Sequence, residues 1–223
     1  MSVLSPARGY ALWAPTYAAE TAVSALDTSA VDAFEIALSG RRVLDVGCGT
    51  ARRLRQARDA GASLAAGVDL TPDMLARADG EPLLAAADVR SLPVADGAFD
   101  VVWCRLVLGH VAELDAAYAE LGRVCAARAH VVVTDFHSAA AAAGHRRTFR
   151  DTRGRVHELE HHVHDERAHR AAAGRAGLSL LERRDAVVSE TVRGFYERAD
   201  RLEAYERQLG LPLVLALLFQ RGG

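Results

Sequence analysis

The residues whose types and spacing point most directly to chemistry lie in segment 43–50, which is VLDVGCGT. Its apolar first half predicts a buried strand, and its glycines predict a turn into a helix over 51–60. Gly47 and Gly49 let a ligand approach the main chain where a side chain would collide with it. Because the first N–H groups of a helix have no partner within it, we expect this turn to bind a carboxylate or a phosphate.

The glycine spacing separates this turn from the common nucleotide-binding motifs. The dinucleotide motif G-x-G-x-x-G needs a third glycine at position 52, where this chain has Arg52. The phosphate-binding P-loop pattern also fails, because no Gly-Lys-Ser/Thr follows the turn. A nucleotide-dependent reductase is therefore disfavoured.

Acidic side chains lie in or at the end of three predicted strands. Asp69 ends the second strand, where a carboxylate can accept hydrogen bonds from both hydroxyls of a ribose. Asp88 ends the third strand, where it can accept a hydrogen bond from an exocyclic amine such as adenine N6. Together with Asp45 of the first strand they predict a pocket for an amino-acid nucleoside. Any one of them could be a helix cap, but that explanation fits all three together poorly.

A regular alternation of strands and helices must position these residues. We predict strands over 42–46, 64–70, 83–87, 99–104 and 130–136, and helices over 51–60, from 71 onward and over 113–125. This alternation predicts right-handed crossovers and a parallel sheet covered on both faces. The end of the chain departs from it, with a strand over 178–188, a helix over 192–209 and a strand over 213–219.

The segment between the fifth strand and residue 178 is rich in histidine. Six of its histidines lie within 25 residues: His145, His157, His161, His162, His164 and His169. A hairpin with its tip at 153–154 and arms over 146–150 and 155–163, then a helix from Asp165, would make this segment a lid beside the strand ends. We predict no metal site, because histidines four residues apart on a strand lie about 13 Å from each other.

Composition limits the class of protein. The chain has 223 residues, half of them hydrophobic, and a formal net charge of −2, so we expect one domain over 1–223 with no general attraction to nucleic acid. Three scattered cysteines exclude a disulfide framework. The sequence shows no signal peptide and no apolar stretch long enough to span a membrane, so we expect a cytoplasmic protein without a membrane partner. The oligomeric state is not predicted.

Four segments of the chain resemble motifs I to IV of the class I S-adenosylmethionine-dependent methyltransferases. They are VLDVGCGT, GVDLTPDML, ADVRSLPVADGAFDVVWCRLVLGHV and HVVVTDF, and the match spans about residues 10 to 136. The small-molecule branch, with quinone and carrier-protein-ester methyltransferases, is the most similar. The resemblance implies an α/β fold: a Rossmann-like, doubly wound, seven-stranded sheet, mostly parallel with an antiparallel C-terminal hairpin. A cap segment over 1–30 and a lid insertion over 137–177 would complete it.

The resemblance also implies S-adenosyl-L-methionine as the cofactor and a role for individual residues. Asp45 would support the turn and could contact the cofactor amino group through a water molecule. Asp69 would hold the ribose. The residues expected around the methionine part are Gly47, Cys48, Gly49, Cys104 and Arg105. Those expected around the adenine are Leu70, Met74, Asp88 and Val89. Tyr10, Trp13 and Tyr17 would close over the cofactor, although their helical spacing also suits a face packed on the core.

A hydroxyl acceptor must lose its proton, and histidine is suited to accept it. His137 follows the fifth strand and His110 the fourth, so both are candidate bases at the carboxyl ends of strands. We therefore predict methyl transfer to a small molecule, with oxygen as the first acceptor atom. The alternatives are a carbon or nitrogen acceptor, a carrier-bound substrate, and a non-catalytic cofactor-binding module that acts through a partner.

Overall fold

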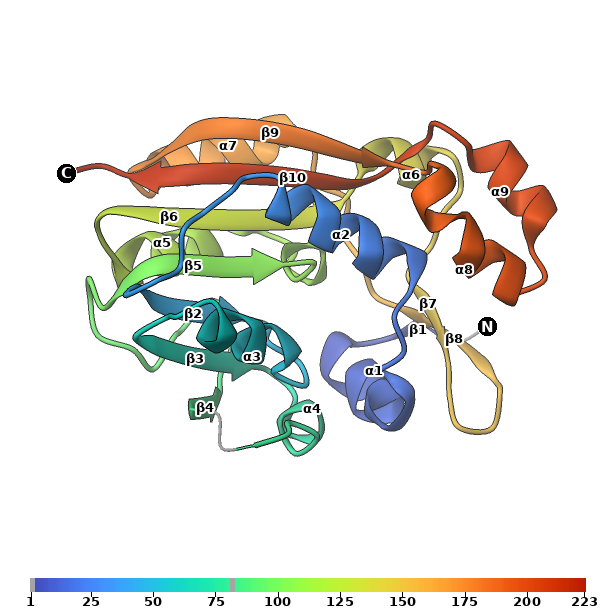
Figure 1. The fold of residues 1–223 in the computed structure, drawn as a ribbon, viewed down its shortest axis with the longest axis horizontal. Helices are drawn as coiled ribbons and strands as arrows, with labels where there is room; N and C mark the ends of the chain where they lie inside the picture. Colours follow the sequence, from blue (N-terminus) through green and yellow to red (C-terminus); the bar gives the residue numbers. More distant parts are fainter. Residues whose placement is uncertain (1–2, 81–82) are drawn as a thin grey trace.

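The computed structural model describes residues 3–80 and 83–223 (Figure 1). One sheet has the strand order β4-β3-β2-β5-β6-β10-β9. These strands are β2 (Arg42–Val46), β3 (Leu64–Asp69), β4 (Leu83–Ala86), β5 (Phe99–Arg105), β6 (Cys125–Phe136), β9 (Leu178–Val187) and β10 (Pro212–Arg221). β2 to β6 pair in parallel, and β10 pairs antiparallel with β6 and β9. The predicted seven-stranded sheet with an antiparallel C-terminal hairpin is confirmed.

Helices cover both faces of this sheet (Figure 1). On one face α2 (Ala22–Asp32) and α3 (Arg52–Asp59) pack on alternate strand residues, such as Val101 and Trp103 of β5. On the other face α5 (Leu114–Val124) and α7 (Glu166–Arg175) pack on the intervening strand residues, whose side chains point the opposite way. Because successive side chains of a strand point to opposite faces, the almost wholly apolar β5 contributes to both cores.

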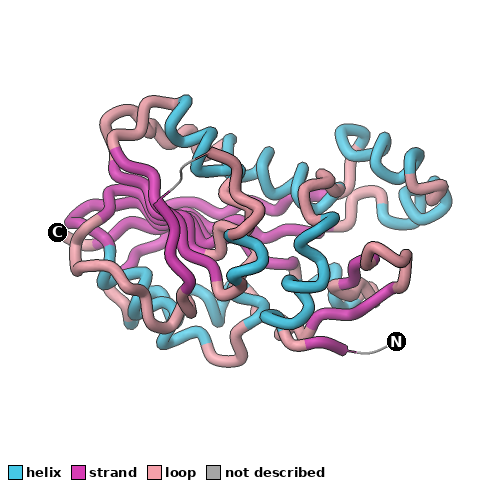
Figure 2. Tube along the Cα trace, turned by 90° about the horizontal axis from the view of Figure 1, so that it is seen from below, coloured by secondary structure: helices cyan, strands magenta, loops and turns pink. Residues whose placement is uncertain are grey.

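A second sheet, of three short strands, lies apart from the first (Figure 2). The predicted hairpin forms from β7 (Thr148–Arg150) and β8 (Val156–Leu159), with shorter arms than expected. β1 (Val3–Leu4) pairs in parallel with β8, and α1 (Pro6–Trp13) follows it directly. A Cβ on Gly9 would fall on the side chain of Leu159, so this glycine allows α1 to lie against β8. The N-terminal segment and the hairpin are thus joined.

Several elements differ from the sequence-based expectation. The helix expected over 192–209 is divided into η3 (Glu190–Val192), α8 (Arg193–Arg198) and α9 (Leu202–Gln208). The break lies at Asp200, whose φ of 54° is left-handed and cannot continue a helix, although aspartate tolerates it better than most residues. β6 begins directly after α5, and α4 (Pro72–Leu75) is a single turn. The alanine-rich segment forms α6 (Ser138–Ala142), which the sequence analysis did not predict.

A buried ion pair connects α2 to the sheet. The Arg105 guanidinium donates to Asp27 Oδ2 from Nε at 3.1 Å and from Nη2 at 2.8 Å. The Thr134 hydroxyl donates to the other carboxylate oxygen at 2.6 Å. The side chains of Arg105 and Asp27 are only 4% and 2% exposed, so each charge depends on the other for the interactions that water would supply. Within the described residues, no helix is long and apolar enough to cross a membrane.

Replacing Asp27 by alanine should therefore leave a buried, unpaired guanidinium. We expect the free energy of unfolding to fall by about 3–5 kcal/mol, measured by chemical denaturation. The matched control is Asp79→Ala, which removes the exposed ion pair between Asp79 and Arg55 and should cost no more than about 1 kcal/mol. Equal losses in the two variants would contradict the role given to the buried pair.

Candidate functional site

A cavity of about 390 Å³ lies where β2, β3, β4 and β5 end. The chain leaves β2 for β3 on one side and returns to β5 on the other, and ligands bind at such points of reversal in open α/β sheets. The N-terminal segment and the residues after β8 form the opposite wall, which includes Ser5, Tyr10 and Glu160.

The turn after β2 has an unusual backbone. Gly47, Gly49 and Ala51 all have left-handed φ values, of 74°, 56° and 59°. The N–H groups of Gly47 and Cys48 both donate to the carbonyl of Val68, at 2.7 and 3.0 Å. A Cβ on Gly47 would fall on the side chain of Val107. The packing of the protein therefore requires this glycine, in addition to any requirement from a ligand.

Two of the residues expected at the turn do not face the cavity with their side chains. Cys48 is buried against Gly67 of β3, where a Cβ would lie 2.7 Å from its sulfur. Gly47 and Gly49 line the cavity. Asp45 is fully buried behind the turn and accepts from Arg53 Nε at 3.0 Å. Arg53 also donates to the carbonyl of Gly47 at 3.2 Å, so Asp45 supports the turn through this arginine.

Asp69 connects the turn to the next strand. Its two carboxylate oxygens accept from the backbone N–H groups of Gly49 and Thr71, both at 2.8 Å. Burial raises the pKa of Asp69 above its ordinary value, against the effect of these hydrogen bonds. Each oxygen keeps a further lone pair, so the carboxylate that lines the cavity can still accept two hydroxyl hydrogen bonds.

Another part of the cavity lining is apolar. Leu70, Met74 and Val89 line it, and Met74 is fully buried. Asp88 lines it as well, and its Oδ2 accepts from Arg90 Nη2 at 2.7 Å. Hydrogen bonding to Arg90 lowers the pKa of Asp88, so this carboxylate stays charged.

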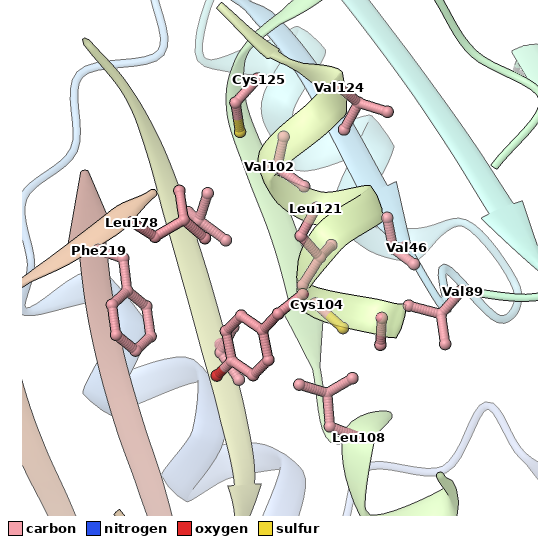
Figure 3. Close-up of a cluster of buried hydrophobic side chains, with 14 of the residues drawn as sticks. Val46, Val89, Val102, Cys104, Leu108, Leu121, Val124, Cys125, Leu178 and Phe219 are labelled. Atoms are coloured by element: carbon pink, nitrogen blue, oxygen red, sulfur yellow. The ribbon is translucent and has the colours of Figure 1, made fainter. Parts of the chain in front are cut away.

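The two residues expected beside the methionine amino group lie differently from each other. Cys104 has its side chain in the core under the sheet, with Leu108 and Leu121 around it (Figure 3). Arg105 lines the cavity, but its guanidinium is held by Asp27.

The N-terminal aromatic residues divide between the inside and the outside of the wall. Tyr10 and Tyr17 line the cavity. Burial raises the pKa of Tyr17 to about 12, so its hydroxyl stays protonated. Trp13 stacks on Phe149 of β7 with a centroid distance of 5.0 Å, and it lines a separate depression on the outer side. Trp13 thus fastens α1 to the hairpin.

His110, at the end of η2 (Leu108–His110), lies on the cavity wall with both ring nitrogens bonded. Nδ1 lies 2.9 Å from the carbonyl of Glu160, which can only accept, so Nδ1 carries the hydrogen. Nε2 is therefore unprotonated and accepts from the Tyr10 hydroxyl at 3.0 Å. Burial, followed by the charge of Arg147, lowers the pKa of His110 to about 4. A neutral imidazole results, with its acceptor nitrogen bonded to the Tyr10 hydroxyl.

His137 lies elsewhere and does not line this cavity. Its Nδ1 accepts from the N–H of Ala139 at 3.0 Å and caps α6, while Nε2 lies 3.4 Å from Asp185. Both ring nitrogens thus have partners outside the cavity. The structure brings only one of the two candidate bases to the predicted pocket.

Sequence analysis did not single out three residues that complete the site. Arg53 supports the turn, Glu160 fixes the tautomer of His110, and Arg147 Nη2 donates to the Tyr10 hydroxyl at 3.3 Å. The one sequence signal for these residues was the spacing of Arg53, eight residues after Asp45, because an arginine at that distance can reach an aspartate across a strand–helix turn. Among the residues that the structure describes, no group of three or more His, Cys, Asp or Glu side chains is placed to hold a metal ion.

Comparisons with known proteins agree with this geometry. Residues 44–133 match the family model described as a methyltransferase domain. The chain is 40% identical over 85 residues to malonyl-[acyl-carrier protein] O-methyltransferase of Pseudescherichia vulneris, a match covering 37% of this chain and 34% of that protein. It is 38% identical over 120 residues to demethylmenaquinone methyltransferase of Parafrankia sp. (strain EAN1pec), covering 44% of this chain and 47% of that one. These matches span between a third and a half of the relatives' length.

A solved structure shows the same fold over nearly the whole chain. The S-adenosylmethionine-dependent methyltransferase from Mesorhizobium loti superposes with a TM-score of 0.70 at 21% identity, covering 90% of this chain and all of that one. Its fold, the matched domain and the motifs at the turn and strand ends agree with one another. Residues 44–133 therefore form a methyltransferase domain within a chain that has the fold of S-adenosylmethionine-dependent methyltransferases, and these matches support S-adenosyl-L-methionine as its cofactor.

Proposed function

We propose that this protein transfers a methyl group from S-adenosylmethionine to an oxygen atom of a small molecule. The observation that carries the proposal is the state of His110, a neutral imidazole whose unprotonated Nε2 accepts from the hydroxyl of Tyr10, with both residues on the wall of the cavity. An acceptor hydroxyl needs a group of this kind to take its proton.

The residues around the cavity suit the cofactor. Asp69 is placed for the ribose hydroxyls, the apolar part with Leu70, Met74 and Val89 for the adenine ring, and Asp88 for its amino group. The volume of about 390 Å³ lies within the range of small-molecule sites. When bound, the cofactor supplies a methyl group activated by its positively charged sulfur.

Tyr10 and His110 can remove a proton together. The Tyr10 hydroxyl donates to His110 Nε2 and accepts from Arg147, so its oxygen is held between a base and a cation. A proton leaving the acceptor oxygen can move to the Tyr10 oxygen while the Tyr10 proton moves to Nε2. A pKa of about 4 keeps His110 in its base form at neutral pH. It also makes His110 a weak base, which favours an acidic hydroxyl, such as a phenol or an enol, over an alkyl alcohol.

The names of the relatives support this reading in part. The first is an O-methyltransferase acting on a carrier-bound malonyl group, and the second acts on demethylmenaquinone. The matched methyltransferase domain ends at residue 133 and contains neither Tyr10 nor Glu160. The part of the cavity that we assign to the acceptor is therefore lined by residues outside the match to the family. We further propose that segment 137–177 acts as the lid, and that the protein works in the cytoplasm, where its three buried cysteines stay reduced.

Turnover separates the proposal from its alternatives. The wild-type protein should release S-adenosylhomocysteine with at least one member of a panel of phenols, enols, carboxylic acids and amines. Mass spectrometry of the product identifies the methylated atom and distinguishes oxygen from carbon and nitrogen. Tight cofactor binding with no release from any acceptor would instead support a non-catalytic module.

Asp69→Asn should weaken the binding of S-adenosylhomocysteine by roughly 10- to 100-fold, because a charged acceptor of two ribose hydrogen bonds is lost. Asparagine keeps one acceptor oxygen for the backbone N–H groups that Asp69 now holds, so it disturbs the turn less than alanine would. Titration calorimetry measures the affinity. The control is Asp73→Asn, an exposed position in α4, which should bind like the wild type. Wild-type affinity in Asp69→Asn would exclude the ribose contact.

His110→Gln should lower turnover by roughly 10²- to 10⁴-fold, the usual span for loss of a general base, while cofactor affinity changes by less than about threefold. Steady-state release of S-adenosylhomocysteine and calorimetry measure the two quantities. His137→Ala is the control: it should lower the free energy of unfolding by about 0.5–2 kcal/mol, through the lost cap of α6, and leave turnover unchanged. If the two variants exchange these effects, His137 is the base.

A further inference from the structure

A short segment after β8 is bound along the loop that carries His110. We name residues 160–164 the clasp and residues 109–111 the base loop. Three hydrogen bonds join them: His110 Nδ1 to the Glu160 carbonyl at 2.9 Å, the His162 N–H to the Gly109 carbonyl at 2.7 Å, and His164 Nε2 to the Val111 carbonyl at 2.8 Å. Every residue of the base loop therefore has a partner in the clasp.

The remaining histidine of the clasp points inward. The ring of His161 lies edge-on to that of His110, with a centroid distance of 5.6 Å and an interplanar angle of 90°. Its Nε2 lies 3.8 Å from Asp135 Oδ1, at the end of β6, and burial lowers the pKa of His161 to about 4. Neutral His161 thus fills the space between the base and a buried carboxylate.

Asp135 is 2% exposed and lies between two histidines. Its Oδ2 is 3.3 Å from Nε2 of His169, a fully buried residue of α7. His169 Nδ1 is in turn bonded to the hydroxyl of Tyr118 of α5 at 3.0 Å. The carboxylate thus lies against His169 on the helix side without a hydrogen bond from it, and its other oxygen, which accepts from the Phe136 N–H at 2.7 Å, faces the clasp.

Gly109 makes this approach possible. A Cβ at position 109 would fall on His161 Nε2 and lie 2.8 Å from Asp135 Oδ1. Gly109 has no left-handed φ, so the backbone itself would accept alanine. Position 109 cannot carry a side chain because both the clasp and Asp135 lie so close to it.

We propose that Gly109, His161 and Asp135 are positioning residues for methyl transfer, because they seat the clasp that holds His110 with Nε2 as its acceptor nitrogen. The inference rests on the role proposed above for His110. When the Glu160 carbonyl is not bonded to Nδ1, nothing fixes the hydrogen there. The tautomer with hydrogen on Nε2 cannot take a proton at that atom, so an unseated clasp reduces the competent fraction of the enzyme.

Asp135 can act on His110 in two ways that have opposite signs. The charged or titratable groups facing His110 are Tyr10 of α1, Arg147 before β7, His161 of the clasp and Asp135 of β6, and Glu160 faces it with its backbone carbonyl. The negative charge of Asp135 raises the pKa of His110, so its loss alone would lower that pKa further below about 4. If Asp135 seats the clasp, its loss exposes His110 to water and raises the pKa toward its ordinary value, near 6.5.

The test is nuclear magnetic resonance of the imidazole nitrogens in the full chain, labelled with ¹⁵N. Long-range ¹H–¹⁵N spectra show which nitrogen carries hydrogen, and the His110→Gln spectrum assigns the signals. In the wild type we expect hydrogen on Nδ1 of His110 and a titration midpoint near pH 4. In Gly109→Ala and in Asp135→Asn we expect a mixture of tautomers and a midpoint raised by at least one pH unit. His161→Phe, which keeps a ring, provides a third variant should either of these fail to fold.

Two controls match these variants. Gly174→Ala makes the same substitution on α7, where an added Cβ has nothing within 4 Å. Asp151→Asn removes another buried carboxylate of segment 137–177, one that accepts from His157 at 3.0 Å and has no contact with His110. Both should keep the wild-type tautomer and midpoint of His110. A change of the same size in the controls would overturn the inference.

Three further results would overturn it: hydrogen on Nε2 in the wild type, an unchanged His110 in the folded variants, or a midpoint that falls instead of rising. With an acceptor in hand, Gly109→Ala should lower kcat by roughly tenfold, for a competent fraction of about a tenth, and leave the KM for the cofactor unchanged. None of these spectra needs an acceptor. Failure of the positioning role is therefore distinct from failure of methyl transfer, which would show as no turnover by the wild type.

Discussion

The turn between β2 and α3 must keep its backbone open to a ligand while three of its residues hold left-handed φ values. Such a turn has few contacts of its own, so neighbouring elements have to fix it. The carbonyl of Val68 and the carboxylate of Asp69, both in β3, bind its N–H groups, and Arg53 of α3 binds the carbonyl of Gly47. The position of β3 beside β2, and that of α3 over them, therefore determines whether the pocket exists.

The two sides of the cavity manage buried polar groups in different ways. Below the turn, Arg53 and Arg105 are charged, and each is held by a buried aspartate. A buried charge is tolerable only when a partner replaces its lost water. His110, which lines the cavity, and His161, which packs beside it, stay neutral, with pKa values lowered to about 4. The buried groups near the turn are thus paired charges, and the histidines are neutral.

The wall over the cavity is built from segments far apart in the chain. β1 pairs with β8, Trp13 stacks on Phe149, and the clasp binds the base loop after β5. Each contact is small, and a two-residue strand such as β1 has no stability alone. Together these contacts join the N-terminal segment and the hairpin into one structure, which lies at the carboxyl ends of the strands of the seven-stranded sheet.

The sequence by itself determined the order along the chain of the strands in the large sheet and the carboxyl-end positions of Asp69 and Asp88, while the antiparallel direction of the final hairpin was expected only from the family resemblance. The strand order and these positions follow from local signals: apolar runs, helix-forming segments and turns can be read within about ten residues. Only the tertiary structure decided that His110 faces the cavity while His137 caps α6, and that Cys48 and Cys104 point into the core. Only it placed Glu160 against His110, fifty residues away. A strand's sequence shows which residues are apolar. The tautomer and pKa of a histidine, in contrast, depend on carbonyls and charges that distant segments bring to it.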